Sequence, residues 1–245
     1  KDNITKQISQ ISDGRLIWGG DNTVKEIKSF RAKTRSIDLT FGDRYSFAVI
    51  NSESLKKLNE NQMMNLIKNF YNDTYLVDQN ACSSPHLIIW LGKANKIKNI
   101  FWQKLLEYVK ENYDHPSIAS IDKLSDLYNS IILNKEIKKI KTFDKFLYVI
   151  TLKKLHKNLD NNRGRWGFFY QIELENFIEI KNFMTDKFQT MTYFGLDKEK
   201  LKKFIQNNQI NGLNRIVPIG QALNINFYWD GYDILNILTK KIDLR

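Results

Sequence analysis

The stretch DQNACSSPHLIIWLG, residues 78–92, joins a short polar segment directly to an apolar one. DQNACSSPH is rich in turn-forming residues, whereas LIIWLG has the length and unbroken apolar character of a buried strand. We therefore expect a loop that carries Cys82 to the start of a central strand.

Hydrophobic patterns on both sides of this stretch alternate between helix and strand. This alternation predicts an α/β fold with a mainly parallel sheet flanked by helices. A basic segment at 135–141 is expected to be exposed. The predicted helices are 23–30, 51–72, 99–113, 124–133, 197–207 and 232–241, and the predicted strands are 16–20, 36–39, 46–50, 87–92, 146–152, 168–174, 189–194 and 215–219, with 225–228 a further candidate.

The composition describes a globular chain. Of its 245 residues 42% are hydrophobic and 13% aromatic, so a substantial core can be buried. No apolar stretch approaches the roughly 20 residues of a membrane span. The polar amino end does not resemble a signal peptide and has no initiating Met, so we expect a piece of a longer chain.

The single cysteine, Cys82, cannot form an internal disulfide, which favours a reducing, cytoplasmic setting. One cysteine and three scattered histidines predict no metal site. The net charge of +11 would suit nucleic acid, but the lysines are spread along helices and form no basic arm. A phosphate-bearing small molecule, such as a coenzyme A ester, would also suit a basic surface.

Cys82 is the strongest nucleophile in the sequence. Loops held by a rigid scaffold often carry reactive side chains, and a thiolate attacks thioesters readily. A buried, inert cysteine remains the alternative. His86 follows four residues later, but catalytic partners of cysteines usually come from distant positions, so we expect a solvated or hydrogen-bonded histidine at the strand's mouth.

Two further segments could hold a phosphate. Gly19 and Gly20 follow a predicted strand and precede a helix, as phosphate-facing turns do, although a plain tight turn fits equally. Arg163 and Arg165 lie in a polar loop and could pair with a phosphate or simply be solvated. Neither a P-loop motif nor a G-x-S-x-G motif occurs.

Several motifs, in order, resemble one known family. The sequence resembles acyl-CoA reductases of the LuxC type, a family similar to the aldehyde dehydrogenase superfamily. The resemblance spans nearly the whole chain, and ACSSP together with RIVPIG…WDG is its most specific part. The motifs are IWGG (17–20), FGDRYS (41–46), DQNACSSPH (78–86), QT (189–190), GLNRIVPIG (212–220) and WDGYD (229–233).

This resemblance implies a domain plan. Residues 1–34 would be the remnant of a dinucleotide-binding domain, and residues 35–220 would be an aldehyde-dehydrogenase-like catalytic domain. Residues 221–245 would pack back on that domain. Most of the dinucleotide-binding domain would be missing from this chain.

The resemblance also implies a reaction. Cys82 would attack the thioester of a long-chain fatty acyl-CoA, with Ser83 beside the oxyanion, and NADPH would reduce the acyl-enzyme to an aldehyde. Gly19 and Gly20 would lie near the cofactor. An acyl-protein synthetase partner, a homo-oligomer and a link to bioluminescence are further implications.

Two positions depart from the aldehyde dehydrogenase pattern. Thr40 stands where those enzymes carry a glutamate base, which disfavours hydrolysis of the acyl-enzyme. The glutamate that touches the nicotinamide ribose has no equivalent in residues 161–169, where Arg163 and Arg165 are possible substitutes. Two other functions stay open: a cysteine acyltransferase that never reduces its acyl-enzyme, and a basic nucleic-acid-binding module.

Overall fold

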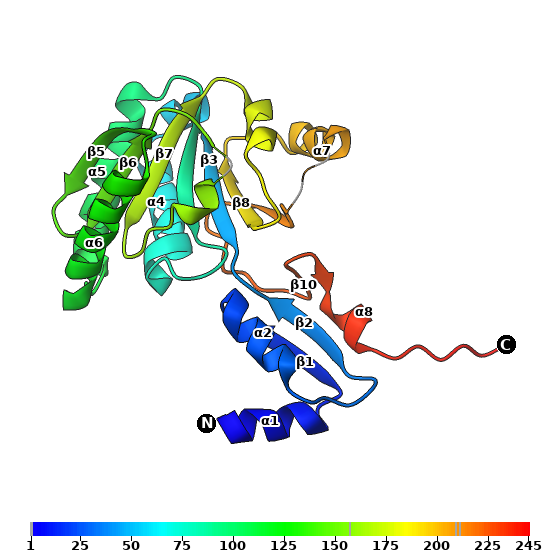
Figure 1. Cartoon of the computed structure of the whole chain (residues 1–245). Coiled ribbons are helices and arrows are strands. Elements are labelled where there is room, and N and C mark those ends of the chain that lie inside the picture. Colours follow the sequence, from blue (N-terminus) through cyan, green and yellow to red (C-terminus); the bar gives the residue numbers. More distant parts are fainter. Residues whose placement is uncertain (1, 157, 209, 211) are drawn as a thin grey trace. The chain divides into compact units, whose positions relative to one another are not determined.

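A seven-stranded sheet forms the centre of the larger part of the chain. In the computed structural model, which describes residues 2–156, 158–208, 210 and 212–245, its strands lie in the order β5-β6-β7-β4-β3-β8-β9 (Figure 1). All neighbouring pairs are parallel except β5 and β6, so the predicted α/β class with a mainly parallel sheet is confirmed. The strands are β3 (Tyr45–Asn51), β4 (Pro85–Leu91), β5 (Ile137–Phe143), β6 (Leu147–Leu152), β7 (Phe168–Leu174), β8 (Phe188–Phe194) and β9 (Arg215–Pro218).

Two hydrophobic cores lie on opposite faces of this sheet, because successive strand side chains point to opposite sides. Ala48 and Ile50 of β3 join the core under α3, α4 and α5, whereas Phe47 and Val49 join the core on the other face. That second core includes residues of α6, α7 and the 3-10 helices η2 and η3. The helices are α3 (Ser52–Lys56), α4 (Glu60–Thr74), α5 (Asn95–Asn112), α6 (Ser117–Leu133), α7 (Lys198–Asn207), η1 (Tyr75–Val77), η2 (Leu159–Asn161) and η3 (Phe177–Asn182).

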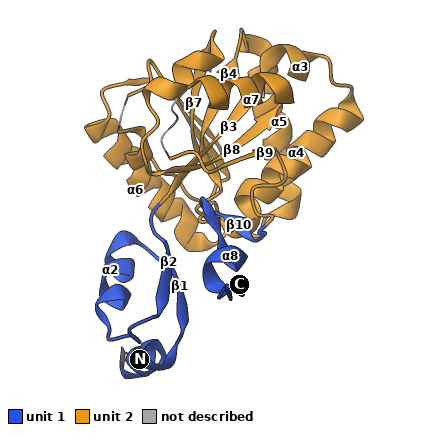
Figure 2. Ribbon diagram, turned by 90° about the vertical axis from the view of Figure 1, so that its right-hand side faces the viewer, with its two compact units in different colours: residues 1–43, 225–245 blue, residues 44–224 orange. Residues whose placement is uncertain are grey.

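The chain divides into two compact units, which Figure 2 colours separately. Unit 1 comprises residues 1–43 and 225–245, and unit 2 comprises residues 44–224 with the sheet. The boundaries expected from the family resemblance, at 34/35 and 220/221, describe domains of a longer protein and stay a prediction.

Unit 1 contains a parallel pair of strands and a small hairpin. β1 pairs with β2 from Gly14↔Ile37 to Trp18↔Phe41, and Trp18 stacks on Phe41 with ring centroids 4.0 Å apart. Asp230 and Gly231 both have positive φ and form the two-residue turn between β10 and β11. The elements are α1 (Asp2–Ile11), β1 (Gly14–Trp18), α2 (Asp21–Ser29), β2 (Ile37–Phe41), β10 (Tyr228–Trp229), β11 (Tyr232–Asp233) and α8 (Ile234–Leu238).

One predicted helix was wrong, and one strand was not predicted. The helix expected at 51–72 is two helices, because Asn59 begins a new one: its side chain accepts from the Gln62 N–H, and the Gln62 side chain accepts from the Asn59 N–H. The basic segment at 135–141 exposes Lys135, Lys138 and Lys139, as expected, but most of it forms the edge strand β5. Ile137 and Ile140 of this strand pack against the core.

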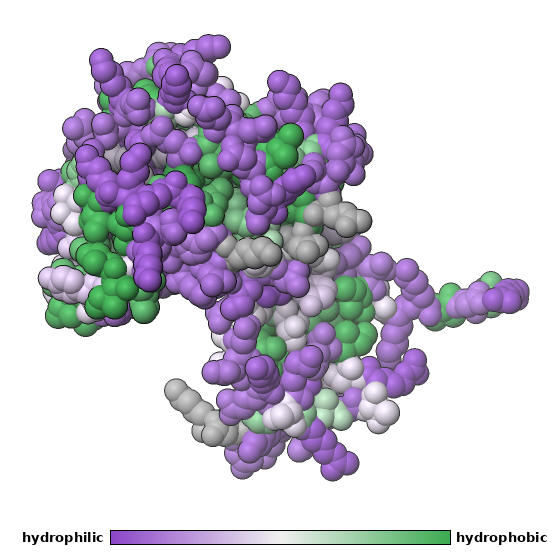
Figure 3. Space-filling model, turned by 45° about the horizontal axis from the view of Figure 1, so that its top comes forward, coloured by the Kyte–Doolittle hydropathy of each residue, from purple (hydrophilic) through white to green (hydrophobic). Residues whose placement is uncertain are grey.

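Helix α6 is longer than the predicted 124–133, and apolar side chains lie on both its buried and its exposed side. Ala119, Lys123 and Leu127 are its buried residues. Its aspartates, Asp122 and Asp126, are half-buried, and apolar side chains gather on the surface of unit 2 (Figure 3). The exposed apolar residues of α6 are Ile118, Ile121, Leu124, Tyr128, Ile131, Ile132 and Leu133.

Candidate functional site

Cys82 lies half-buried in the loop that precedes β4, as the sequence predicts. Asp78 and Gln79 open this loop with left-handed φ angles of 54° and 59°, and the Ser84 N–H closes a turn on the Ala81 carbonyl at 2.9 Å. Since parallel strands share one direction, the amino ends of β3, β4, β7, β8 and β9 meet at one edge of the sheet. The cysteine therefore lies at the amino edge of the sheet.

Ser46 fixes the backbone of Cys82. Its Oγ donates to the Cys82 carbonyl oxygen at 2.7 Å and accepts from the Thr190 N–H at 3.2 Å. The hydroxyl is buried and bridges β3, β8 and the cysteine loop. The nucleophile is thus positioned by the sheet itself, and no flexible linker separates them.

Gln79 joins the cysteine loop to the loop that carries the two candidate arginines. Its fully buried amide donates from Nε2 to the Pro85 carbonyl at 3.0 Å and to the Phe168 carbonyl at 3.1 Å. Its Oε1 accepts from the N–H groups of Gly167 and Phe168, both at 3.2 Å. The Trp166 N–H adds a bond to the Asp78 carbonyl at 3.1 Å.

His86 is a structural residue. Its Nδ1 donates to the Gly164 carbonyl at 3.0 Å, and its ring stacks on Tyr45 with centroids 5.4 Å apart. Burial lowers the pKa of His86 to about 3, with a further contribution from the Arg163 cation, which the Gly164 carbonyl partly offsets. The expected hydrogen bond is present, but the ring is buried and neutral, so it is a poor base at neutral pH.

The two candidate arginines point to different surroundings. Arg165 lies over the Trp166 ring, and its guanidinium is 3.7 Å from Asp122 and 3.9 Å from Asp126 on α6. Arg163 donates from Nε to the Asp160 carbonyl at 3.3 Å and acts electrostatically on His86. Arg163 is therefore the arginine on the side of the cysteine loop.

A half-buried arginine, Arg215, also acts on the cysteine, and our sequence reasoning missed its role. The Arg215 guanidinium donates to the carbonyls of Ala222, Gln221 and Asn224 at 2.5–2.7 Å. Burial lowers the pKa of Arg215, and the charges of Asp73 and Cys82 partly offset that shift. A permanent cation thus lies within electrostatic range of the thiol, and the arginine inside the otherwise apolar RIVPIG segment was the available signal.

Asp73 holds the segment after β9 in place. Its carboxylate accepts from the Gly220 N–H at 2.6 Å and from the Ala222 N–H at 2.9 Å. Burial raises the pKa of Asp73 to about 6, although these two N–H groups and Arg215 favour the ionised form. Asp73 and Arg215 together fix residues 220–224 behind the cysteine loop.

Ser83 is buried directly after Cys82. Its expected role beside an oxyanion stays a prediction. Among the residues that the structure describes, no group of three or more His, Cys, Asp or Glu side chains could hold a metal ion. None of the described helices is long and apolar enough to cross a membrane.

Gly19 and Gly20 belong to unit 1 and form the turn between β1 and α2. The Gly19 N–H donates to the Phe41 carbonyl at 3.2 Å, and Gly20 precedes the first residue of α2. A Cβ on Gly20 would be 3.7 Å from the Asp43 carboxylate, and Asp21 accepts from the Asp43 N–H. Because two carboxylates border this turn, it suits groups that donate hydrogen bonds better than it suits an anion.

Comparison with known proteins adds a family and a fold. The family model described as acyl-CoA reductase (LuxC) matches residues 1–157, which include Cys82 but end before Arg163 and Arg165. No curated protein matches the sequence significantly.

Solved structures of aldehyde dehydrogenases share the fold. An NAD-dependent aldehyde dehydrogenase from Sinorhizobium meliloti is 9% identical with a TM-score of 0.60, covering 89% of this chain and 45% of that one. A methylmalonate-semialdehyde dehydrogenase from Oceanimonas doudoroffii is 10% identical with a TM-score of 0.61, covering 90% and 48%.

Lactaldehyde dehydrogenase from Escherichia coli is 9% identical with a TM-score of 0.57, covering 88% and 47%. The expected aldehyde-dehydrogenase-like fold is therefore confirmed. The chain spans about half the length of these structures.

Proposed function

Because the chain belongs to the LuxC family of acyl-CoA reductases, we propose that it takes part in the NADPH-dependent reduction of long-chain fatty acyl-CoA to aldehyde. One observation carries this proposal. The single cysteine lies on a loop fixed from behind by Ser46 and tied by Gln79 to residues 167–168. Such fixation is what a nucleophile needs to meet a carbonyl carbon in a defined direction.

The first step is acyl transfer to Cys82. The thiolate sulfur attacks the thioester carbonyl carbon, a new C–S bond forms, and the bond to coenzyme A breaks, releasing its thiol after proton uptake. The Arg215 cation favours the thiolate form before attack. We assign the N–H groups of Cys82 and Ser83 to the oxyanion that develops on the carbonyl oxygen.

The second step releases the aldehyde. When bound, NADPH supplies the hydride that the thioester carbon accepts. The chain's own contribution is to regenerate the Cys82 thiolate as the acyl C–S bond breaks. The family resemblance aligns Thr40 with the acidic base of aldehyde dehydrogenases, and a threonine hydroxyl is a poor base, so we propose that the acyl-enzyme resists hydrolysis.

Each unit offers groups of its own that could hold a nicotinamide cofactor in our proposal. Gly19 and Gly20 would face its nicotinamide nucleoside, since the neighbouring carboxylates can accept from ribose hydroxyls. Arg163 is the better of the two arginines for a phosphate, because Arg165 already lies beside two aspartates.

The remaining proposals concern the longer protein. We propose that a dinucleotide-binding domain completes the site and that residues 1–34 are its remnant, with 35–220 as the catalytic domain and 221–245 as a segment packed on it. A homo-oligomer, an acyl-protein synthetase partner and a role related to bioluminescence follow from the family. We place the reaction in the cytoplasm, where the thiol stays reduced.

Release of coenzyme A tests the acyl-transfer step. The chain is mixed with tetradecanoyl-CoA, and free coenzyme A is quantified by chromatography, alongside Cys82→Ser. We expect a burst of one coenzyme A per chain and no burst from the variant, with acetyl-CoA reacting more slowly. An equal release by Cys82→Ser would contradict the proposal.

Reduction is tested separately. NADPH is added to the acylated chain, with and without a supplied dinucleotide-binding domain, and aldehyde is trapped as a hydrazone. Aldehyde that forms only with NADPH and faster with the added domain supports a reductase. An acyl-enzyme that NADPH never discharges, even in the complete protein, would indicate an acyltransferase.

A further inference from the structure

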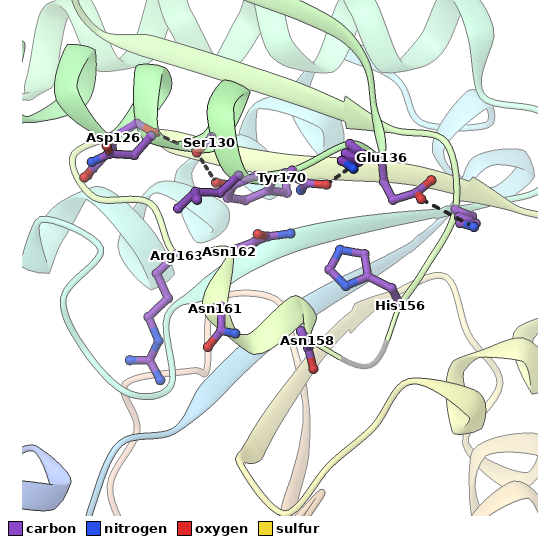
Figure 4. A pocket seen from close by; sticks show the side chains of 14 residues that line it. Asp126, Ser130, Glu136, His156, Asn158, Asn161, Asn162, Arg163 and Tyr170 are labelled. Carbon is purple, nitrogen blue, oxygen red and sulfur yellow. Dashed lines mark hydrogen bonds and ion pairs between the residues drawn. The ribbon is translucent and has the colours of Figure 1, made fainter.

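A cavity lies in unit 2 between α6 and the segment that joins β6 to β7 (Figure 4). It has a volume of about 600 Å³, which is within the range of small-molecule sites. Asp126 and Ser130 of α6 line one side, and His156, Asn162 and Arg163 line the other. None of the described residues that line it belongs to the cysteine loop, so this cavity is separate from the acyl-accepting site.

Three buried polar atoms around this cavity have no hydrogen-bond partner among the described residues. They are Nδ2 of Asn134, Nε2 of His156 and Nδ2 of Asn162. The other amide atom of Asn134 is used, because its Oδ1 accepts from the Glu136 N–H at 2.9 Å. Buried polar groups are normally paired, so the convergence of three such atoms on one cavity points to a ligand that pairs them.

The side chains in Figure 4 show where that ligand would lie. His156 and Asn162 point into the space beside Tyr170. Ser130 donates to the Asp126 carbonyl at 2.7 Å, so its Oγ accepts from the Tyr170 hydroxyl, also at 2.7 Å. Burial raises the pKa of Tyr170 to about 12, and its neutral phenol oxygen is left to accept from a hydroxyl group.

Charges around the cavity favour a ligand with a modest negative charge. Glu136 lies 3.4 Å from Lys154, and Asp126 lies 3.9 Å from Arg165 outside the cavity, so both carboxylates already have cations nearby. Three cationic side chains line the cavity, against these two carboxylates, so the lining carries a small positive excess. The cations are Lys135, Lys154 and Arg163.

We propose that this cavity binds a small phosphate ester rich in hydroxyl groups, of the size and chemistry of a sugar phosphate. Asn134, His156 and Asn162 pair with its hydroxyl and ester oxygens, and the phosphate group meets the lysines and Arg163. The Tyr170 oxygen accepts from one hydroxyl. The inference does not rest on the proposed acyl transfer, because Cys82 and the groups that fix its loop take no part in it. Arg163 is the one residue shared with the proposed cofactor contacts, and it lines this cavity.

Titration with ribose 5-phosphate tests the site, with ribose and inorganic phosphate as separate probes. The readout is the imidazole proton signal of His156 in the intact chain, assigned by its loss in His156→Phe. We expect this signal to shift and saturate with ribose 5-phosphate, at least about tenfold more tightly than with either fragment. An unmoved His156 signal, or equal affinity for inorganic phosphate, would overturn the proposal.

A matched pair of variants sharpens the test by calorimetry. Asn162→Leu should weaken ribose 5-phosphate binding by at least about tenfold, because one donor is lost. Asn207→Leu replaces an exposed asparagine on α7 and should leave the affinity unchanged. Equal affinities of the two variants, once both are shown to be folded, would contradict the assignment.

Discussion

The cysteine loop of unit 2 and the glycine turn of unit 1 were both sequence candidates, but the structure fixes them very differently. Gln79, Ser46 and His86 tie the cysteine loop to strands and loops distant in sequence. The turn at Gly19 and Gly20 is held by backbone and aspartate bonds within unit 1, between β1, β2 and α2. Acyl transfer should therefore be a property of unit 2 by itself, whereas cofactor binding needs more than the turn.

Gly167→Ala should have the largest effect on stability. A Cβ there would lie 2.2 Å from the Tyr75 hydroxyl and 2.4 Å from the Phe146 carbonyl, at a φ of +84°. We expect urea unfolding to show a loss of about 3 kcal/mol or more.

Gly92→Ala is the matched control for that change. Its φ is +82°, but a Cβ would meet no atom within 4 Å, so it should lose only the backbone cost of about 1–2 kcal/mol. Equal losses for both variants would show that the loop around Gly167 is not tightly held.

Acidification should lower the folding stability through His86, which is buried at the end of the cysteine loop. The folded pKa of about 3 lies below the unfolded value of 6.5, so the unfolded chain binds a proton that the folded chain cannot. This contribution to stability is complete above pH 6.5 and decreases as the pH falls, by about 3 kcal/mol between pH 7 and pH 4. Unfolding of His86→Gln should lack this decrease, and parallel pH profiles would contradict the buried, neutral histidine.

Asp73 should act in the opposite direction. Its folded pKa of about 6 lies above the ordinary 3.8, so the folded chain binds the extra proton. The contribution of Asp73 to folding stability is least favourable above pH 6, and it improves by about 2 kcal/mol as the pH falls to 4. Subtracting the pH profile of Asp73→Asn from that of the parent should reveal this slope, and a flat difference would indicate a solvated carboxylate.

Gly20→Ala should have the smallest effect. Its φ is −63°, and a Cβ would meet only ordinary contacts. The free energy of unfolding and the activation free energy of Cys82 acylation should therefore each change by less than about 0.5 kcal/mol. Thermal unfolding and coenzyme A release measure both. A marked loss of acylation in a stable variant would show that the turn takes part in the first step.

Local patterns predicted the part of the fold that positions Cys82. The apolar run of β4 and the polar loop before it are neighbours in sequence, so one window of residues contains both. The break at Asn59 was missed because the apolar stripe continues in register through it. β5 was missed because its lysines outweigh Ile137 and Ile140, which alone mark its inner face.

Contacts between distant residues explain what the sequence did not predict in the site. Gln79 and Phe168 are 89 positions apart, and Asp73 and Gly220 are 147 apart. Only the folded sheet brings these pairs together, so the sequence around Gln79 gave no local signal of its role. Arg215 stood out in an apolar segment, but its partners could not be read from its neighbours. Arg163 and Arg165 likewise differ only in what each meets after folding.

Mass spectrometry after incubation with tetradecanoyl-CoA tests the central claim most directly. The intact mass is measured for the parent chain and for Cys82→Ala, and the modified peptide is then identified. We predict one tetradecanoyl group per parent chain, located on Cys82, and none on the variant. An adduct of equal extent on Cys82→Ala, or no adduct on the parent even with a dinucleotide-binding domain added, would contradict the account.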